Sequence, residues 1–156
     1  MSKTHAAITG KDLPESVETP IDALREYYHG FNQRDMTVVA RNWSDSADVT
    51  LRDPACGPKR GWRAVAAEHE RVFAGPSRVT IELHDFSVHE AGEVFWVVGR
   101  ERGSFHLGDV RLDLAINRTR VFRRVDGRWR QVHDHGSIEI PELLARYQRA
   151  MLQNSR

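Results

Sequence analysis

The stretch TRVFRRVDGRWRQVHDHGS, residues 119–137, predicts two β-strands joined by a tight turn. The turn falls at Asp126-Gly127, because Asp-Gly between two alternating segments favours a type I′ turn, in which both central residues need positive φ. With these two residues as the loop, Val125 faces Arg128 across the hairpin. The sequence therefore predicts an antiparallel strand pair late in the chain.

One face of this predicted hairpin carries an unusual set of side chains. Counting outward from the turn gives three cross-strand pairs: Phe122 with Gln131, Arg120 with His133, and Arg118 with His135. Because strand side chains alternate between faces, these six are expected on one face together with Trp129 and Ser137. Two guanidinium groups and two imidazoles beside aromatic rings suit a cavity that receives an anion better than a plain core.

The same run resembles the closing hairpin of the association domain of calcium/calmodulin-dependent protein kinase II. It is also similar to the free-standing bacterial relatives of that domain, the SnoaL-like branch of the nuclear-transport-factor-2-like superfamily. The match needs no gap at ten positions: Thr119, Arg120, Val121, Asp126, Gly127, Trp129, Val132, His133, His135 and Ser137. The resemblance implies a metal-free α+β fold that hosts cyclases, isomerases, hydrolases and proteins without a known reaction.

Composition limits the possible classes of protein. A chain of 156 residues with 29% charged and 40% hydrophobic residues is long enough for one globular domain with a sizeable core. The net charge of +1 argues against a general polyanion binder, and the single cysteine excludes an intrachain disulfide. No run approaches a membrane span of about 20 apolar residues, and no secretory signal begins the chain, so a cytoplasmic location is expected.

Hydrophobic periodicity places the other elements. Thr19-Pro20 predicts the start of a helix that reaches about Asn32, and a short second helix contains Met36, Val39 and Trp43. A strand over 47–53 and a helix opening at Gly61 follow. Strands are expected over 77–89, 93–107, 109–124 and 128–139, and Pro141 starts a C-terminal helix. Residues 1–17 are polar and aperiodic and are expected to be a disordered tail.

Together these elements predict an α+β cone, a single domain over residues 18–140 with a strongly curved antiparallel sheet wrapped around helices and a central pocket. Residues 141–156 form a helical extension to which the resemblance gives no role. Strands over 93–107 and 109–124 are apolar on both faces, and the helices are too few to cover both. A homodimer or higher homo-oligomer is therefore expected to cover the outer face of the sheet.

His133 and His135 are candidate acid–base residues. Two residues apart on a strand, they point the same way, which could also ligate a metal with Asp53 or His69 as the third ligand. The alternative is a hydrogen-bonded pair that lines a cavity. Because no Glu or Cys accompanies them at metal spacing and the resembling family is metal-free, we expect no metal or other cofactor.

Arginines in strand interiors are candidate ligand-binding residues. Arg100 and Arg120 have the spacing of the pocket arginines in the kinase association domain, so the resemblance implies that both face the pocket; Arg118 has no counterpart there. A ligand carboxylate would satisfy them, and the alternative is internal ion pairs with Glu101, Asp113 or Asp53. The lid-helix histidine and lid tryptophan of the kinase domain correspond to Val65 and Phe73 here.

Asp53, before Pro54 at the expected pocket mouth, is a candidate general base or simply the start of an Asx turn. Further side chains that could line the pocket are Tyr28, Trp43, Trp62, His69, Phe73, Trp96 and Gln131. The six arginines from 118 to 130 could suggest nucleic acid, but half would face inward, so no nucleic-acid partner is expected.

Three functional hypotheses remain. The first is a small-molecule binding protein of SnoaL-like type for an anionic, partly apolar ligand that bears a carboxylate. The second is an enzyme with cyclase, isomerase or hydratase chemistry, in which His133, His135 or Asp53 moves protons in the same pocket. The third is an oligomerisation module like the kinase association domain.

Overall fold

The computed structural model describes residues 4–154, which form helices α1–α4 and strands β1–β6. The bounds are α1 Pro20–Asn32, α2 Met36–Asn42, β1 Thr50–Arg52, β2 Lys59–Arg60, α3 Trp62–Ala74, β3 Arg78–Ala91, β4 Val94–Leu107, β5 Val110–Val125, β6 Arg128–Ser137 and α4 Pro141–Gln153. Each helix and long strand expected from periodicity is present, and the two-residue β2 is an addition.

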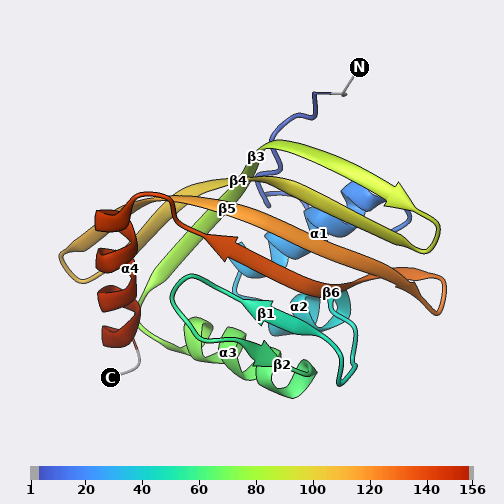
Figure 1. The fold of residues 1–156 in the computed structure, drawn as a ribbon. Helices are drawn as coiled ribbons and strands as arrows, with labels where there is room; N and C mark the ends of the chain where they lie inside the picture. The colour runs from blue at the N-terminus through green and yellow to red at the C-terminus, as the bar shows by residue number, and fades with distance from the viewer. Residues whose placement is uncertain (1–3, 155–156) are drawn as a thin grey trace.

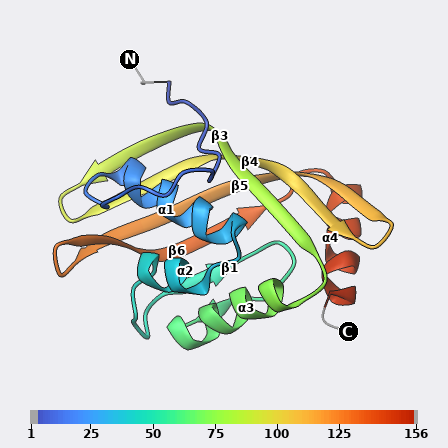
Figure 2. The same ribbon diagram turned by 180° about the vertical axis from the view of Figure 1, so that it is seen from behind.

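The strands form one open sheet in the order β2-β1-β6-β5-β4-β3. The long strands β3–β6 pair antiparallel, whereas β1 runs parallel to β6, so the sheet is mixed at this edge. The sheet is strongly curved, with α1, α2 and α3 on its inner face and α4 upright at one end (Figures 1 and 2). The expected α+β cone is therefore confirmed.

Local sequence explains where the first helix begins. Thr19 is the N-cap of α1, and its hydroxyl accepts a hydrogen bond from the Asp22 N–H while the Asp22 carboxylate accepts one from the Thr19 N–H, which is a capping box. Pro20 occupies the first helical position, where its missing N–H costs nothing. The helix buries Leu24, Tyr27 and Tyr28 against the sheet. Within residues 4–154, no helix combines the length and apolar character that a membrane span needs.

The hairpin turn forms as predicted, with φ of 52° at Asp126 and 75° at Gly127. Val125 pairs with Arg128, and Phe122 pairs with Gln131. Beyond that point the expected register is wrong, because β6 contains a bulge at Val132. Val121 pairs with His133, so Arg120 faces Asp134 rather than His133, and Arg118 faces Gly136 rather than His135. The extra residue exchanges the faces of all residues that follow it.

Residues 4–17 also differ from the expectation of a disordered tail. Ile8 is 4% exposed and forms two backbone hydrogen bonds with Leu83 of β3, at 2.9 and 3.0 Å. His5 stacks on Phe86 with ring centroids 5.0 Å apart. This segment therefore covers part of the edge strand β3, which would otherwise present unpaired backbone groups. Residues 1–3 lie outside the described residues.

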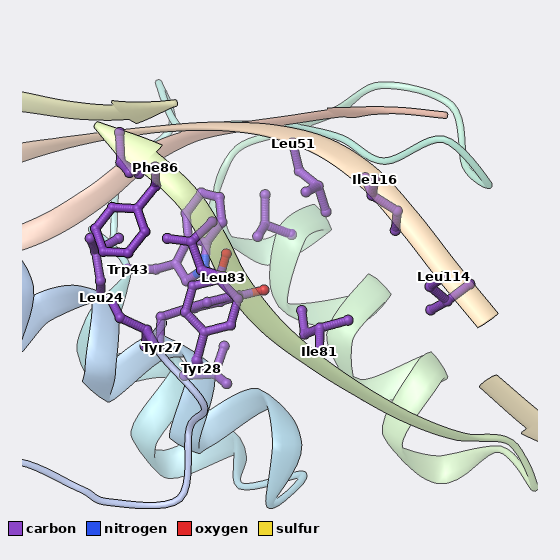
Figure 3. Close-up of a cluster of buried hydrophobic side chains, with 14 of the residues drawn as sticks. Leu24, Tyr27, Tyr28, Trp43, Leu51, Ile81, Leu83, Phe86, Leu114 and Ile116 are labelled. Carbon is purple, nitrogen blue, oxygen red and sulfur yellow. The ribbon is translucent and has the colours of Figure 1, made fainter. Parts of the chain in front are cut away.

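The core lies between the inner face of the sheet and α1–α3. Leu24, Tyr27, Tyr28, Trp43 and Leu83 group tightly in Figure 3, whereas Leu51, Ile81, Leu114 and Ile116 stand apart toward the end of the sheet where α4 packs. The second set belongs to the wall of a cavity.

Candidate functional site

The cavity opens between α1, α3, α4 and the inner face of the sheet, and its volume is about 50 Å³. Its apolar wall comes from Phe31, Val72, Val79, Ile81, Leu114 and Ile116. Its polar residues include Asp53, His69, Arg118, Arg120 and Asp134. An apolar cavity with a few convergent polar groups is the usual form of a small-molecule site.

Arg118 and Arg120 bind two buried carboxylates between them. Arg118 donates from Nε to Glu101 Oε1 at 2.6 Å and from Nη1 to Asp134 Oδ1 at 2.9 Å. Arg120 contacts the other oxygens of both carboxylates, at 3.1 Å each. All four side chains are at most 4% exposed. This arrangement is a closed ring of ion pairs, which is the internal salt-bridge alternative rather than a free anion site.

The outer contacts of this ring fix it in the fold. Arg120 Nη1 donates to Gln131 Oε1 at 2.8 Å, and its guanidinium carbon lies 3.9 Å from the centroid of the Tyr27 ring. Tyr28 donates to Glu101 Oε2 at 2.7 Å. Burial alone would raise the pKa of Asp134, but Arg118 and Arg120 outweigh it and hold that pKa below its usual range. Asp134 is therefore ionised at neutral pH.

Asp53 differs from the two carboxylates of the ring. Its Oδ1 accepts a hydrogen bond from the Ala55 N–H at 3.0 Å, and its Oδ2 lies 3.4 Å from Arg118 Nη2. Its side chain keeps 23% exposure, and it also borders a groove on the outside of the cavity. Burial raises the pKa of Asp53, and Arg118 offsets only part of that rise. A carboxylate with a raised pKa at a cavity mouth can take and return a proton.

His69 forms a second polar pair on the opposite wall. Its Nδ1 lies 2.9 Å from the Val65 carbonyl, which can only accept, so Nδ1 carries the proton in the neutral ring. Nε2 therefore accepts a hydrogen bond from the Tyr27 hydroxyl at 3.1 Å. Burial lowers the pKa of His69, so the ring is neutral at neutral pH.

Four of the residues expected in the pocket line the cavity: Asp53, His69, Arg118 and Arg120. Arg100 does not, because β4 turns Glu101 inward and leaves Arg100 exposed on the opposite face. The expected fork of Arg100 and Arg120 is therefore not formed. Trp96 also lies on the outer face, where it stacks on His89 at 5.3 Å.

His133 and His135 follow the bulge and lie away from the cavity. His133 Nδ1 lies 2.6 Å from the Thr50 hydroxyl, His135 is exposed beside the outer groove, and the two ring centroids are 5.9 Å apart. Neither Asp53 nor His69 completes a metal site with them: among residues 4–154, no three His, Cys, Asp or Glu side chains are grouped to hold a metal ion.

The remaining expected residues do not line the cavity but contact residues that do. Tyr28 and Gln131 hold the ion-pair ring, while Trp43 packs in the core against Trp62 and His69. Phe73 borders a smaller neighbouring space and contacts Phe31. Glu101 was expected only as an alternative ion-pair partner of the arginines, and it takes that role here. Sequence reasoning missed three residues that matter here: Tyr27, Asp134 and Tyr147. A regular strand alternation puts Asp134 outward, and only the bulge brings it in.

Several solved structures are similar to this chain. A candidate dehydratase of the NTF2-like family from Streptomyces avermitilis is 21% identical, with a TM-score of 0.72 over 80% of this chain and 96% of that one. A candidate calcium/calmodulin-dependent protein kinase type II association domain from Thiobacillus denitrificans is 26% identical, with a TM-score of 0.64 over 80% and 98%. A candidate ketosteroid isomerase from Shewanella frigidimarina is 17% identical, with a TM-score of 0.63 over 74% and 93%.

None of the curated proteins compared with the chain matches it. The model of the SnoaL-like domain family matches residues 21–141, which include strands β1–β6, helices α2 and α3, and all of α1 except Pro20. The hairpin resemblance and the sheet topology agree with this match. The chain therefore belongs to the SnoaL-like domain family.

Proposed function

We propose that this protein binds a small, partly apolar molecule in the cavity and catalyses proton transfer on it, with Asp53 as the general base. The observation that carries the proposal is the Asp53 carboxylate, which borders an apolar cavity, is held through Ala55 and Arg118, and has a raised pKa. A base whose pKa lies nearer to neutrality accepts and returns a proton more effectively at neutral pH.

The ligand that best fits this cavity is neutral rather than anionic. Arg118 and Arg120 each contact both Glu101 and Asp134. With Asp53 ionised, two arginines face three carboxylates, so a ligand carboxylate would meet net negative charge. We therefore replace the expected anionic ligand by a neutral molecule with a polar group, such as a ketone.

Proton abstraction next to a carbonyl is the reaction class that this arrangement supports. Asp53 would remove a proton from the carbon beside the carbonyl, the electron pair would move into an enolate, and the resulting carboxylic acid would return the proton. Two similar structures carry the names of a candidate dehydratase and a candidate ketosteroid isomerase, and both names imply the making and breaking of carbon–hydrogen bonds.

The test measures deuterium incorporation at the α-carbons of cyclopentanone in D₂O by NMR. Wild-type protein should accelerate the exchange, and Asp53→Asn should lower the enzyme-dependent rate by roughly 10²-fold or more, the range for loss of a general base. Asp113→Asn is the matched control, because Asp113 is exposed on the outer face of β5. Equal rates in both variants and wild type would exclude Asp53 as the base.

A homodimer through the outer face of the sheet is proposed separately. His89, Trp96, Val98 and Val121 lie together there, and Val98 is 46% exposed. An exposed apolar patch on the uncovered face of a sheet favours association. Sedimentation equilibrium should give twice the chain mass, and Val98→Glu should give the monomer. Val110→Glu, at the exposed start of β5, should leave the dimer intact; a monomeric wild type would contradict the proposal.

A further inference from the structure

Helix α4 closes the cavity, although it lies outside the matched SnoaL-like span. The family match ends at residue 141, where α4 begins, and Tyr147 and Met151 from this helix line the cavity. A part of the chain beyond the matched family span therefore contributes directly to the site.

Contacts on two sides fix the position of α4. The Tyr147 ring packs edge-on against Phe105 of β4, with centroids 6.1 Å apart. At the end of the helix, the Asn154 carboxamide accepts a hydrogen bond from the Ser77 N–H at 2.9 Å. Gln148 Nε2 donates to the Pro54 carbonyl at 3.1 Å, which joins α4 to the loop that carries Asp53.

The Tyr147 hydroxyl stands out among the tyrosines of the site. Tyr27 donates to His69 and Tyr28 donates to Glu101. Tyr147 is only 6% exposed, yet within residues 4–154 its hydroxyl has no hydrogen-bond partner. It is not one of the fully enclosed polar atoms without partners, so the hydroxyl is not sealed off, and the Tyr147 side chain lines the cavity. Buried polar groups nearly always have a partner, so this hydroxyl lacks one that a ligand can supply.

We propose that Tyr147 is a ligand-recognising residue, whose hydroxyl donates a hydrogen bond to a carbonyl oxygen of the molecule on which Asp53 acts. This inference rests on the proposed function and deepens it, because it names the residue that recognises the carbonyl group of the ligand. Burial raises the pKa of Tyr147, and the neighbouring Asp53 raises it further, so the hydroxyl keeps its proton and stays a donor.

The size of the cavity gives α4 a second role. A volume of about 50 Å³ is well below the roughly 150 Å³ of a cavity that accepts benzene. A ring-sized ligand therefore requires the cavity walls to yield, and the Gln148–Pro54 hydrogen bond is one contact that resists this opening. Changes at Gln148 should affect every ligand alike, whereas a change of the Tyr147 hydroxyl should affect only ligands that carry an oxygen.

The experiment titrates ¹⁵N-labelled protein with cyclopentanone and with methylenecyclopentane, in which a CH₂ group replaces the oxygen. Wild type should bind the ketone roughly threefold to tenfold more tightly, the effect of one hydrogen bond. Tyr147→Phe keeps the ring and should abolish this preference without changing the affinity for the hydrocarbon. Gln148→Ala, the control in the same helix, should change both affinities by the same factor.

Two other outcomes would contradict either the role of Tyr147 or the proposed function itself. If Tyr147→Phe keeps the preference for the ketone, or weakens both probes equally, Tyr147 only packs and this inference fails while the proposed function stands. If neither probe shifts the resonances of the cavity residues in wild type, the proposed function fails as well.

Discussion

Replacement of Arg120 by methionine should strongly destabilise the protein. Arg120 is 1% exposed, contacts Glu101 and Asp134 at 3.1 Å each, donates to Gln131 at 2.8 Å and lies over the Tyr27 ring. Its loss leaves two buried carboxylates with Arg118 as their shared cation. Removing one partner from a buried ion pair costs about 3–5 kcal/mol. For a chain of this length, each kcal/mol lowers the melting temperature by about 2–4 °C.

The expected fall in melting temperature is therefore about 6–20 °C. The assays are thermal unfolding, which gives the melting temperature, and urea unfolding, which gives the free energy of unfolding by extrapolation to water, both followed by circular dichroism. Arg100→Met is the matched control, because Arg100 is exposed on the opposite face of the sheet and its loss should change stability by no more than about 0.5 kcal/mol. If Arg120→Met costs no more than Arg100→Met, the ion-pair ring does not hold the fold as argued.

Three further predictions concern the same site. The pKa of Asp53 in the folded protein is raised above the ordinary 3.8, so its favourable contribution to stability is present below pH 3.8 and is lost as pH rises through the folded-state pKa. Between pH 4 and 7, the urea midpoint of Asp53→Asn should therefore increase relative to that of wild type. A difference between the two midpoints that stays constant with pH would contradict this. The pKa of His69 in the folded protein is lowered from 6.5, so its contribution to stability is present above pH 6.5 and is lost as pH falls through the folded-state pKa. In His69→Gln, the melting temperature should therefore fall less steeply between pH 6.5 and 5 than in wild type. The same pH dependence of the melting temperature in both proteins would count against this. A Cβ on Gly136 would lie 2.5 Å from Arg118 Nη1, so Gly136→Ala should cost about 1–3 kcal/mol in urea unfolding, and a neutral effect would mean that Arg118 can move aside freely.

Local signals in the sequence predicted most of the fold. The capping residues Thr19 and Asp22 fix the start of α1, and Asp126-Gly127 fixes the hairpin turn, because each depends only on residues within one turn of chain. Asp53, His69, Arg118 and Arg120 could likewise be placed in the cavity. The sequence could identify these residues because polar side chains in apolar segments need partners wherever they lie.

The other residues of the site could not be predicted, because the alternation of apolar and polar residues along the strands does not determine their positions. On β4, both Phe95-Val97 and Trp96-Val98 are apolar, so polarity alone could not tell whether Arg100 or Glu101 faces inward. The packing of Ile8 on Leu83 joins residues far apart in sequence, and one isoleucine in a polar segment gives no periodic signal. The role of Tyr147 follows from the tertiary position of α4, which no local pattern predicts.

The bulge at Val132 means that one hairpin sequence is compatible with two different interiors. With a regular ladder, His133 and His135 would point inward and imidazole rings would line the pocket. Because Val132 forms a bulge, Asp134 points inward instead and forms ion pairs with the arginines. A shortened hairpin without Val132 would keep the carboxylate interior, because the residues on either side already alternate as a continuous strand. Val132 thus resembles a one-residue insertion that left the inner face unaltered, and strand length at this position could vary during evolution without changing the chemistry of the site.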